Sequence, residues 1–117
     1  MKTVLIVDDD VAQLQYLSDL LKEHYEVQTV NNPISAYKTC EEKQFSAIIV
    51  DVHMPVINGF EFIKSLKTNL KYETALFILS SDSTPLTKLL ALDLGIKDFL
   101  WPEMNKDELL LRIKNHL

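Results

Sequence analysis

The sequence predicts an α/β fold, a (βα)5 chain folded into a doubly wound, five-stranded parallel sheet with helices on both faces. Short apolar runs alternate five times with longer amphipathic stretches along the 117 residues. Three of the short runs are continuously apolar, which is typical of parallel strands that helices cover on both faces. Five βα units joined by right-handed crossovers then form one open sheet. The predicted strands are Thr3–Val7, Glu26–Val30, Ser46–Val50, Ala75–Leu79 and Ile96–Leu100.

The second predicted strand has a different pattern from the others. Apolar and polar residues alternate from Tyr25 to Val30, which is typical of a strand at the edge of a sheet. An edge position for this strand agrees with a flavodoxin-like strand order, one of the common orders of doubly wound sheets. We therefore predict a flavodoxin-like arrangement of the five strands.

Amphipathic stretches between the strands predict five helices. Each stretch places apolar residues at helical spacing, and capping residues or first-turn prolines precede four of them. The expected starts are Asp9 or Asp10, Asn32 with Pro33, Asn58, and Thr84 with Pro85, and the expected end of the fourth helix is Gly95. The apolar residues, helix by helix, are Val11, Leu14, Leu17 and Leu21; Ile34, Tyr37 and Cys40; Phe62, Ile63 and Leu66; Leu86, Leu89 and Leu90; and Leu109, Leu110, Ile113 and Leu117.

Composition and charge narrow the classes of protein that this chain fits. Its 117 residues are 47% apolar, which suits one domain over residues 1–117. No apolar run reaches the ~18 residues of a membrane span, and the N-terminus lacks the pattern of a secretory signal. The net charge of −5 argues against direct binding of nucleic acid. Cys40, the single cysteine, is expected to be a small buried hydrophobe in a cytoplasmic protein.

Aspartates follow two of the buried strands. Asp8, Asp9 and Asp10 come directly after the first strand, and Asp51 comes directly after the third. Because ligands of open parallel sheets bind outside the carboxyl ends of the strands, Asp8, Asp9 and Asp51 are expected to meet in one small pocket. Their mutual repulsion would favour a divalent cation with oxygen ligands, and Mg²⁺ fits a site with few protein ligands. Aspartates also end strands and cap helices, but a third aspartate after another strand favours a site.

A metal ion beside a carboxylate indicates phosphoryl chemistry. A carboxylate can attack phosphorus as a nucleophile and form an acyl phosphate while the cation neutralises charge on the phosphoryl oxygens. Such a site needs further donors, and Ser80 and Ser81, directly after the fourth strand, supply hydroxyl groups. Serines also end strands for ordinary turn reasons, so their position alone is weak support.

These segments resemble the receiver domains of response regulators in two-component signalling, over nearly the whole chain. Val4–Asp10 resembles the opening strand and acidic pair of that family. Ile48–Glu61 resembles its phosphorylation segment, in which an aspartate precedes Met-Pro, then Gly and Glu, and is the most specific match. Gly95–Leu100 resembles the last strand, and Asp107–Leu110 the start of the final helix.

The resemblance implies a role for each matching residue. Asp51 would be the phosphoacceptor, Asp8 and Asp9 would hold Mg²⁺ together with Asp51, and the backbone carbonyl of His53 would complete the protein ligands. Ser80 would be the hydroxyl that moves towards the phosphoryl group.

Three further side chains follow from the same resemblance. Phe99 matches the aromatic residue that swings inward when the hydroxyl moves, although an ordinary core aromatic would look the same in the sequence. His53 and Asp82 stand at positions where variable side chains tune the rates of phosphorylation and its loss. A lone imidazole is a poor ligand for Mg²⁺, so the His53 side chain is expected to act on rates.

The sequence departs from the family after the last strand. The family has a lysine followed by proline there, whereas this chain reads Leu100-Trp101-Pro102. Aligned without a gap, Pro102 falls at the lysine position, and shifted by one residue to match the proline, Trp101 does. Neither alignment yields a lysine. Lys97 and Lys106 are the nearest and are expected to be solvated. Phosphorylation could then persist with weaker coupling to output, or the domain could signal by binding alone. The isomer of the Trp101–Pro102 bond, commonly cis in this loop of the family, is left open.

The resemblance implies a sensor histidine kinase or phosphotransfer protein as phosphodonor. Leu86, Leu89, Leu90, Leu92 and Leu94 are more leucines than one core-facing stripe requires, so a homodimer or effector surface on the fourth helix, fifth strand and fifth helix is one interpretation, and a broad buried face is the other. Two rival functions are a phosphorylation-independent pseudo-receiver and a phosphatase of the haloacid dehalogenase type. The phosphatase would need a catalytic lysine and a late acidic pair, which the sequence lacks.

Overall fold

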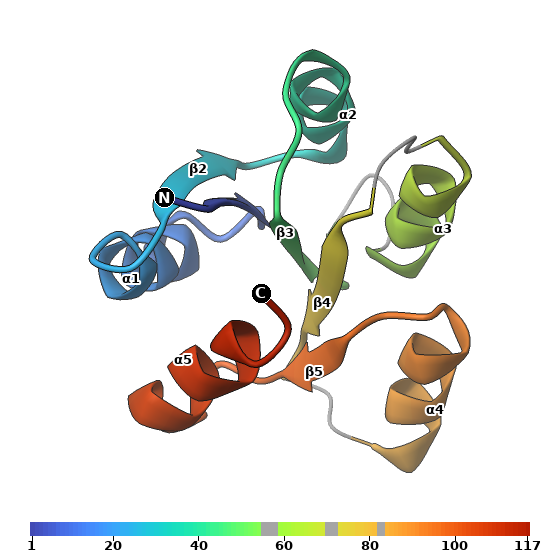
Figure 1. Cartoon of the computed structure of the whole chain (residues 1–117). Helices are drawn as coiled ribbons and strands as arrows, with labels where there is room; N and C mark the ends of the chain where they lie inside the picture. Colours follow the sequence, from blue (N-terminus) through green and yellow to red (C-terminus); the bar gives the residue numbers. More distant parts are fainter. Residues whose placement is uncertain (55–58, 70–72, 82–83) are drawn as a thin grey trace.

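The computed structural model describes residues 1–54, 59–69, 73–81 and 84–117. Five parallel strands form one sheet in the order β2-β1-β3-β4-β5 (Figure 1), which confirms the predicted flavodoxin-like arrangement with the second strand at an edge. The third strand begins one residue later than predicted and includes Asp51, and the fifth begins two residues later. The strands are β1 (Thr3–Val7), β2 (Glu26–Val30), β3 (Ala47–Asp51), β4 (Ala75–Leu79) and β5 (Asp98–Leu100).

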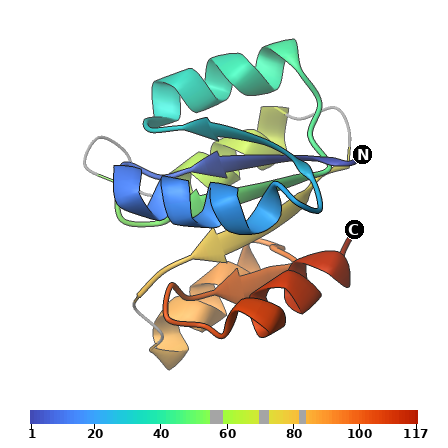
Figure 2. The same ribbon diagram turned by 90° about the vertical axis from the view of Figure 1, so that its left-hand side faces the viewer.

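Helices cover both faces of the sheet. One face carries α1 and α5, and the other carries α2, α3 and α4 (Figure 1). The two chain termini lie at the same end of the molecule, where the strands begin (Figure 2). None of the helices in the described part of the chain has the length and apolar character required to cross a bilayer. The helices are α1 (Val11–Leu21), α2 (Pro33–Glu42), α3 (Gly59–Asn69), α4 (Pro85–Asp93) and α5 (Lys106–Lys114).

Side-chain caps fix three of the predicted helix starts. Asp10, rather than Asp9, caps α1 and accepts a hydrogen bond from the Gln13 backbone N–H at 3.2 Å. Asn32 caps α2 and Thr84 caps α4 in the same way, each followed by the proline of the first turn. The cap predicted at Asn58 lies outside the described residues.

The sheet separates two apolar clusters. The first, here the α2–α4 cluster, contains the side chains that the central strands place on one face of the sheet, together with Cys40, Phe62 and Ala91. The second, the α1–α5 cluster, lies on the other face and includes Leu17 and Leu109. Burial raises the pKa of the Cys40 thiol to about 11, in agreement with its predicted role as a small hydrophobe.

Two residues expected on core-facing stripes are exposed instead. Val11 is 69% exposed and Ile34 is 72% exposed. Each stands in the first turn of its helix, which follows the carboxyl end of a strand. The first buried residues of these helices are Leu14 in α1 and Pro33 in α2.

Most leucines of α4 face away from the core. Leu86, Leu89, Leu90 and Leu92 are 65%, 65%, 50% and 61% exposed, whereas Ala91 is fully buried. Of the two interpretations of these leucines, the broad buried face is therefore wrong. The small side chain of Ala91 belongs to the α2–α4 cluster, so α4 packs against the core through this residue.

We expect replacement of Leu89 by glutamine to change the free energy of unfolding by less than about 0.5 kcal/mol, because this exposed side chain gains little from folding. Replacement of the buried Ala91 by glutamine should cost about 2 kcal/mol or more through overpacking and burial of an amide. Urea denaturation of both variants measures the difference. A large loss of stability in the Leu89 variant would contradict the observed orientation of α4.

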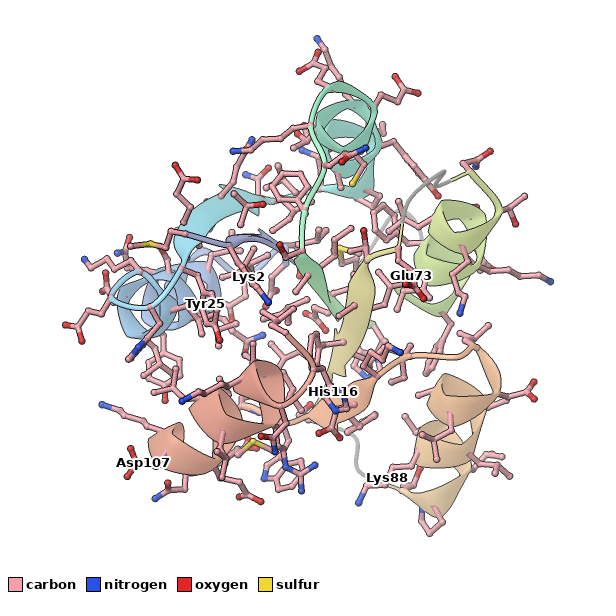
Figure 3. All side chains as sticks on the ribbon, in the orientation of Figure 1. Lys2, Tyr25, Glu73, Lys88, Asp107 and His116 are labelled. Carbon is pink, nitrogen blue, oxygen red and sulfur yellow. The ribbon has the colours of Figure 1, made fainter. Side chains whose placement is uncertain are left out.

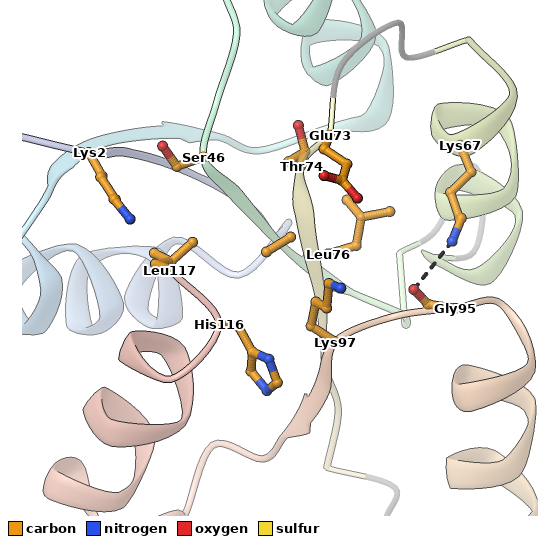
Figure 4. Close-up of a pocket in the computed structure, with 11 residues that line it drawn as sticks. Lys2, Ser46, Lys67, Glu73, Thr74, Leu76, Gly95, Lys97, His116 and Leu117 are labelled. Atoms are coloured by element: carbon orange, nitrogen blue, oxygen red, sulfur yellow. Dashed lines mark hydrogen bonds between the residues drawn. The ribbon is translucent and has the colours of Figure 1, made fainter.

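A hollow of about 500 Å³ lies at the amino ends of the strands, away from the predicted site. Figure 4 shows Lys2, Lys67, Lys97 and His116 around it, with the Lys67 ammonium donating a hydrogen bond to the Gly95 carbonyl at 3.2 Å. Lys97 is thus at the opposite end of the sheet from the aspartates that follow β1 and end β3.

Candidate functional site

Asp8, Asp9 and Asp51 come together at the carboxyl ends of neighbouring strands. Val7 of β1 and Val50 of β3 are paired in register, so the residues that follow them share one edge of the sheet. One carboxylate oxygen from each of the three aspartates lies within 4.8 Å of the others. Asp8 is fully buried, Asp51 is half-buried and Asp9 is exposed. This group, here called the acidic site, confirms the predicted convergence.

The acidic site raises the pKa values of two of its members. Burial is the main reason that the pKa of Asp8 rises from 3.8 to about 7, and the neighbouring Asp51 adds to the rise. Burial likewise raises the pKa of Asp51, to which the negative charges of Asp9 and Asp10 contribute. Each rise measures the cost of placing negative charge here without a cation.

Hydrogen bonds hold the two inner carboxylates in place. The backbone N–H of Asp10 donates to Asp8 Oδ1 at 2.9 Å, and the side-chain amide of Gln13 donates to Asp8 Oδ2. The backbone N–H of His53 donates to Asp51 Oδ1 at 3.0 Å. Sequence reasoning missed Gln13, whose place in the first turn of α1 was the available signal.

The donor set of the acidic site suits a hard divalent cation. It consists of carboxylate oxygens that repel one another, and Mg²⁺ prefers oxygen ligands with several water molecules retained. Within the described residues, no lysine or arginine forms an ion pair with these three aspartates. A cation at this place would therefore be the main source of positive charge.

Ser80 and His53 lie next to the acidic site and contact each other. Ser80 follows β4, is 2% exposed, and donates its backbone N–H to the Leu100 carbonyl of β5 at 3.0 Å. The ring nitrogen Nε2 of exposed His53 lies 3.1 Å from Ser80 Oγ. The sequence suggested that each residue belongs near the site, but it contained no signal for contact between them.

Comparison with known proteins agrees with this arrangement. The sequence matches the family described as response regulator receiver domain over residues 4–114. The chain belongs to the response regulator receiver family. Members of this family are signalling domains rather than metabolic enzymes, so the phosphatase alternative is not supported.

Curated relatives of this receiver domain include longer regulators. It is 33% identical over 115 residues to a transcriptional regulatory protein CpxR homolog of Haemophilus influenzae, covering 97% of this chain and 49% of the relative. It is 30% identical over 118 residues to the transcriptional regulatory protein PcoR of Escherichia coli, covering 100% and 52%. The chain thus spans about half the length of these relatives.

Solved receiver structures have the same fold. The chemotaxis protein CheY4 of Vibrio cholerae is 32% identical, with a TM-score of 0.93 and coverage of 100% of this chain and 99% of that one. The receiver domain of DrrB, described as activated by BeF3, is 26% identical, with a TM-score of 0.89 and coverage of 99% and 97%.

Trp101 and Pro102 follow the end of β5. Trp101 is half-buried and contacts both apolar clusters. The Lys88 ammonium of α4 and the Arg112 guanidinium of α5 lie 5.8 Å and 5.1 Å from the centre of its ring. Figure 3 shows Lys88 extending from α4 on the side towards α5. The Trp101–Pro102 bond, whose isomer the sequence left open, is trans.

The two lysines nearest to that position in the sequence lie elsewhere. Lys97 lines the hollow at the amino ends of the strands, and the Lys106 ammonium lies 5.9 Å from the centre of the Tyr16 ring. Both are exposed, as predicted.

The remaining predicted site residues have different outcomes. Phe99 is 7% exposed and belongs to the α2–α4 cluster, and its role as a switch aromatic stays a prediction. Asp82, predicted to tune reaction rates, lies outside the described residues.

Proposed function

We propose that this receiver domain accepts a phosphoryl group on Asp51 in the presence of Mg²⁺. The observation that carries the proposal is the meeting of three carboxylates within 4.8 Å of one another, beside the buried hydroxyl-bearing Ser80. Receiver domains interact with histidine kinases or phosphotransfer proteins and with effector domains. We propose a sensor histidine kinase or a phosphotransfer protein as the donor, and residues 1–117 as one cytoplasmic receiver domain.

The proposed reaction is a displacement at phosphorus. A carboxylate oxygen of Asp51 attacks the phosphorus of a phosphohistidine and forms the acyl phosphate bond. The bond from phosphorus to the imidazole nitrogen breaks, and the nitrogen keeps the electron pair and then takes a proton. Bound Mg²⁺ supplies charge neutralisation for the phosphoryl oxygens.

The residues of the site have separate roles in this reaction. Asp8, Asp9, Asp51 and the His53 carbonyl would hold the cation. Ser80 would donate its hydroxyl to one phosphoryl oxygen. The movement of that hydroxyl would admit Phe99 to the space it leaves, and His53 and Asp82 would set the rates.

Incubation with acetyl phosphate and Mg²⁺ should add one phosphoryl group per chain, and Asp51→Asn should abolish the addition because the nucleophile is lost. Intact-protein mass spectrometry measures the product. Asp19→Asn is the matched control, since Asp19 is an exposed acid paired with Lys22 on α1, and it should react like the original protein. In parallel, Mg²⁺ and then beryllofluoride should change the fluorescence of Trp101. An unmodified wild-type chain under these conditions would refute the proposal.

The absence of a lysine at Trp101 and Pro102 favours one alternative, a receiver that signals by binding without phosphorylation. That alternative predicts neither acyl phosphate nor a response to beryllofluoride. The same experiment therefore separates the two functions.

We propose that the exposed leucines of α4, with the neighbouring edge formed by β5 and α5, contact a second copy of the chain or an effector. The support is an apolar surface of Leu86, Leu89, Leu90 and Leu92, each at least half exposed. Light scattering with and without beryllofluoride distinguishes the occupants. A doubled mass that Leu89→Gln reduces would support the homodimer, and an unchanged monomer would leave the effector.

A further inference from the structure

We propose that the imidazole of His53 binds the phosphoryl group directly, donating a hydrogen bond from Nε2 to a phosphoryl oxygen on Asp51. This inference rests on the proposed phosphorylation of Asp51. It assigns a contact of the phosphoryl group to a side chain that otherwise would only influence access to the site.

The position of His53 is the first argument. Its backbone N–H donates to the acceptor carboxylate, Asp51 Oδ1, at 3.0 Å. Its ring Nε2 lies 3.1 Å from the hydroxyl oxygen of Ser80. One residue therefore contacts both the nucleophile and the hydroxyl, and its ring borders the space in which a group on Asp51 would meet Ser80.

The need for a donor is the second argument. A phosphoryl group on Asp51 has three oxygens that carry negative charge. The acidic site can offer a cation to one oxygen, and Ser80 offers a hydroxyl to another. A third donor is required if no oxygen is to lose its hydrogen bonds on leaving water.

The locations of the cationic side chains are the third argument. Within the described residues, no lysine or arginine forms an ion pair with the acidic site. Lys88 and Arg112, which flank the end of β5, lie over the ring of Trp101. Lys97 is at the opposite end of the sheet. The imidazole Nε2 of His53, by contrast, lies 3.1 Å from Ser80 Oγ.

Neutral imidazole is sufficient for this contact, because it carries one N–H donor. With the proton on Nε2, the ring donates to Ser80 Oγ before phosphorylation. When the Ser80 hydroxyl turns to the phosphoryl group, the same N–H becomes available to a neighbouring phosphoryl oxygen. A hydrogen bond to a charged oxygen is stronger than one to a neutral hydroxyl, so the exchange favours the phosphorylated state.

Two substitutions test whether His53 acts as a hydrogen-bond donor or only shields the site from solvent. His53→Leu keeps an apolar side chain over the site but removes the N–H, whereas His53→Gln keeps an N–H donor. Both keep the backbone carbonyl. His24→Leu is the control, because His24 is an exposed histidine at the far end of α1.

The measurement is calorimetric titration of each folded, full-length variant with Mg²⁺ alone and then with beryllofluoride at saturating Mg²⁺. His53→Leu should weaken beryllofluoride binding about tenfold or more, because a hydrogen bond to a charged group is lost. Its affinity for Mg²⁺ should stay within about twofold, and His53→Gln and His24→Leu should bind beryllofluoride nearly as tightly as the original chain.

A second substitution tests whether the lost contact can be replaced. Trp101→Lys places an ammonium after β5, and in the His53→Leu background it should restore beryllofluoride binding. Unchanged beryllofluoride affinity in His53→Leu overturns the inference while leaving Asp51 phosphorylation intact. A wild-type chain that takes neither phosphate nor beryllofluoride overturns the proposed function itself.

Discussion

Replacement of Asp8 by asparagine should raise the free energy of unfolding of the Mg²⁺-free receiver domain by up to about 4 kcal/mol at pH 8. The pKa of Asp8 rises from 3.8 to about 7 on folding. Above both values the folded chain must hold a buried carboxylate that is fully hydrated in the unfolded chain. Asparagine has nearly the same shape and no charge, so it removes this cost, provided that the Gln13 amide turns to present its oxygen to the new amide nitrogen.

The sign of the effect determines its pH dependence. Because the folded pKa is the higher one, the folded state binds the proton more tightly, and stability falls as pH rises from about 4 through about 7. The advantage of the asparagine variant should therefore shrink to less than about 2 kcal/mol at pH 5. Urea denaturation in EDTA at pH 5 and pH 8 measures both differences.

Mg²⁺ supplies an independent check on the same variant. The cation should stabilise the original chain at pH 8 and should have little effect on the asparagine variant, which lacks one ligand. Asp19→Asn is the control: the hydrogen bond with Lys22 lowers the pKa of Asp19, so its removal should bring no gain at either pH. Equal stability of the Asp8 variant and the original chain at pH 8 would show that Asp8 carries no such cost.

Replacement of Gly59 by alanine should destabilise the fold by about 3 kcal/mol and impair phosphorylation of Asp51. A methyl group on Gly59 would lie 2.5 Å from Val52 Cα and 2.6 Å from the Asp51 carbonyl oxygen. These are backbone atoms, so no side-chain rotation can relieve the contact. The start of α3 and the end of β3 must then move apart, and a shift of the β3 end displaces Asp51.

Gly95→Ala is the comparison for Gly59. Gly95 has a φ of +76° at the end of α4, and an added methyl group there would meet the ammonium of Lys67, which can move aside. Its cost should be about 1 kcal/mol, mostly from the left-handed backbone. Urea denaturation and acetyl phosphate labelling should rank Gly59→Ala as the more harmful change in both respects. The reverse order would show that the α3 start adapts more readily than the distances indicate.

Residues next to strand ends were the most predictable part of the site. Asp8 and Asp51 each follow a continuously apolar run, and parallel strands bring their carboxyl ends to one edge. Ser80 was predictable for the same reason. The contact between His53 and Ser80 was not, because it depends on how a loop residue turns its ring across the end of another strand.

Burial of helix residues was less predictable than their spacing. The apolar pattern of α4 could not show that Ala91 rather than Leu89 faces the sheet. Val11 and Ile34 fit the apolar spacing of their helices, yet both are exposed in the first turn.

Local pattern alone was sufficient to establish the strand count, the parallel sheet and the edge at which three aspartates meet, because those features follow from short-range apolar periodicity and the geometry of βα units. The packed structure decided which side chains touch there and how strongly burial opposes their charge. It also decided which leucines remain exposed. These properties depend on distances between segments far apart in the chain, which only the assembled sheet and helices bring together.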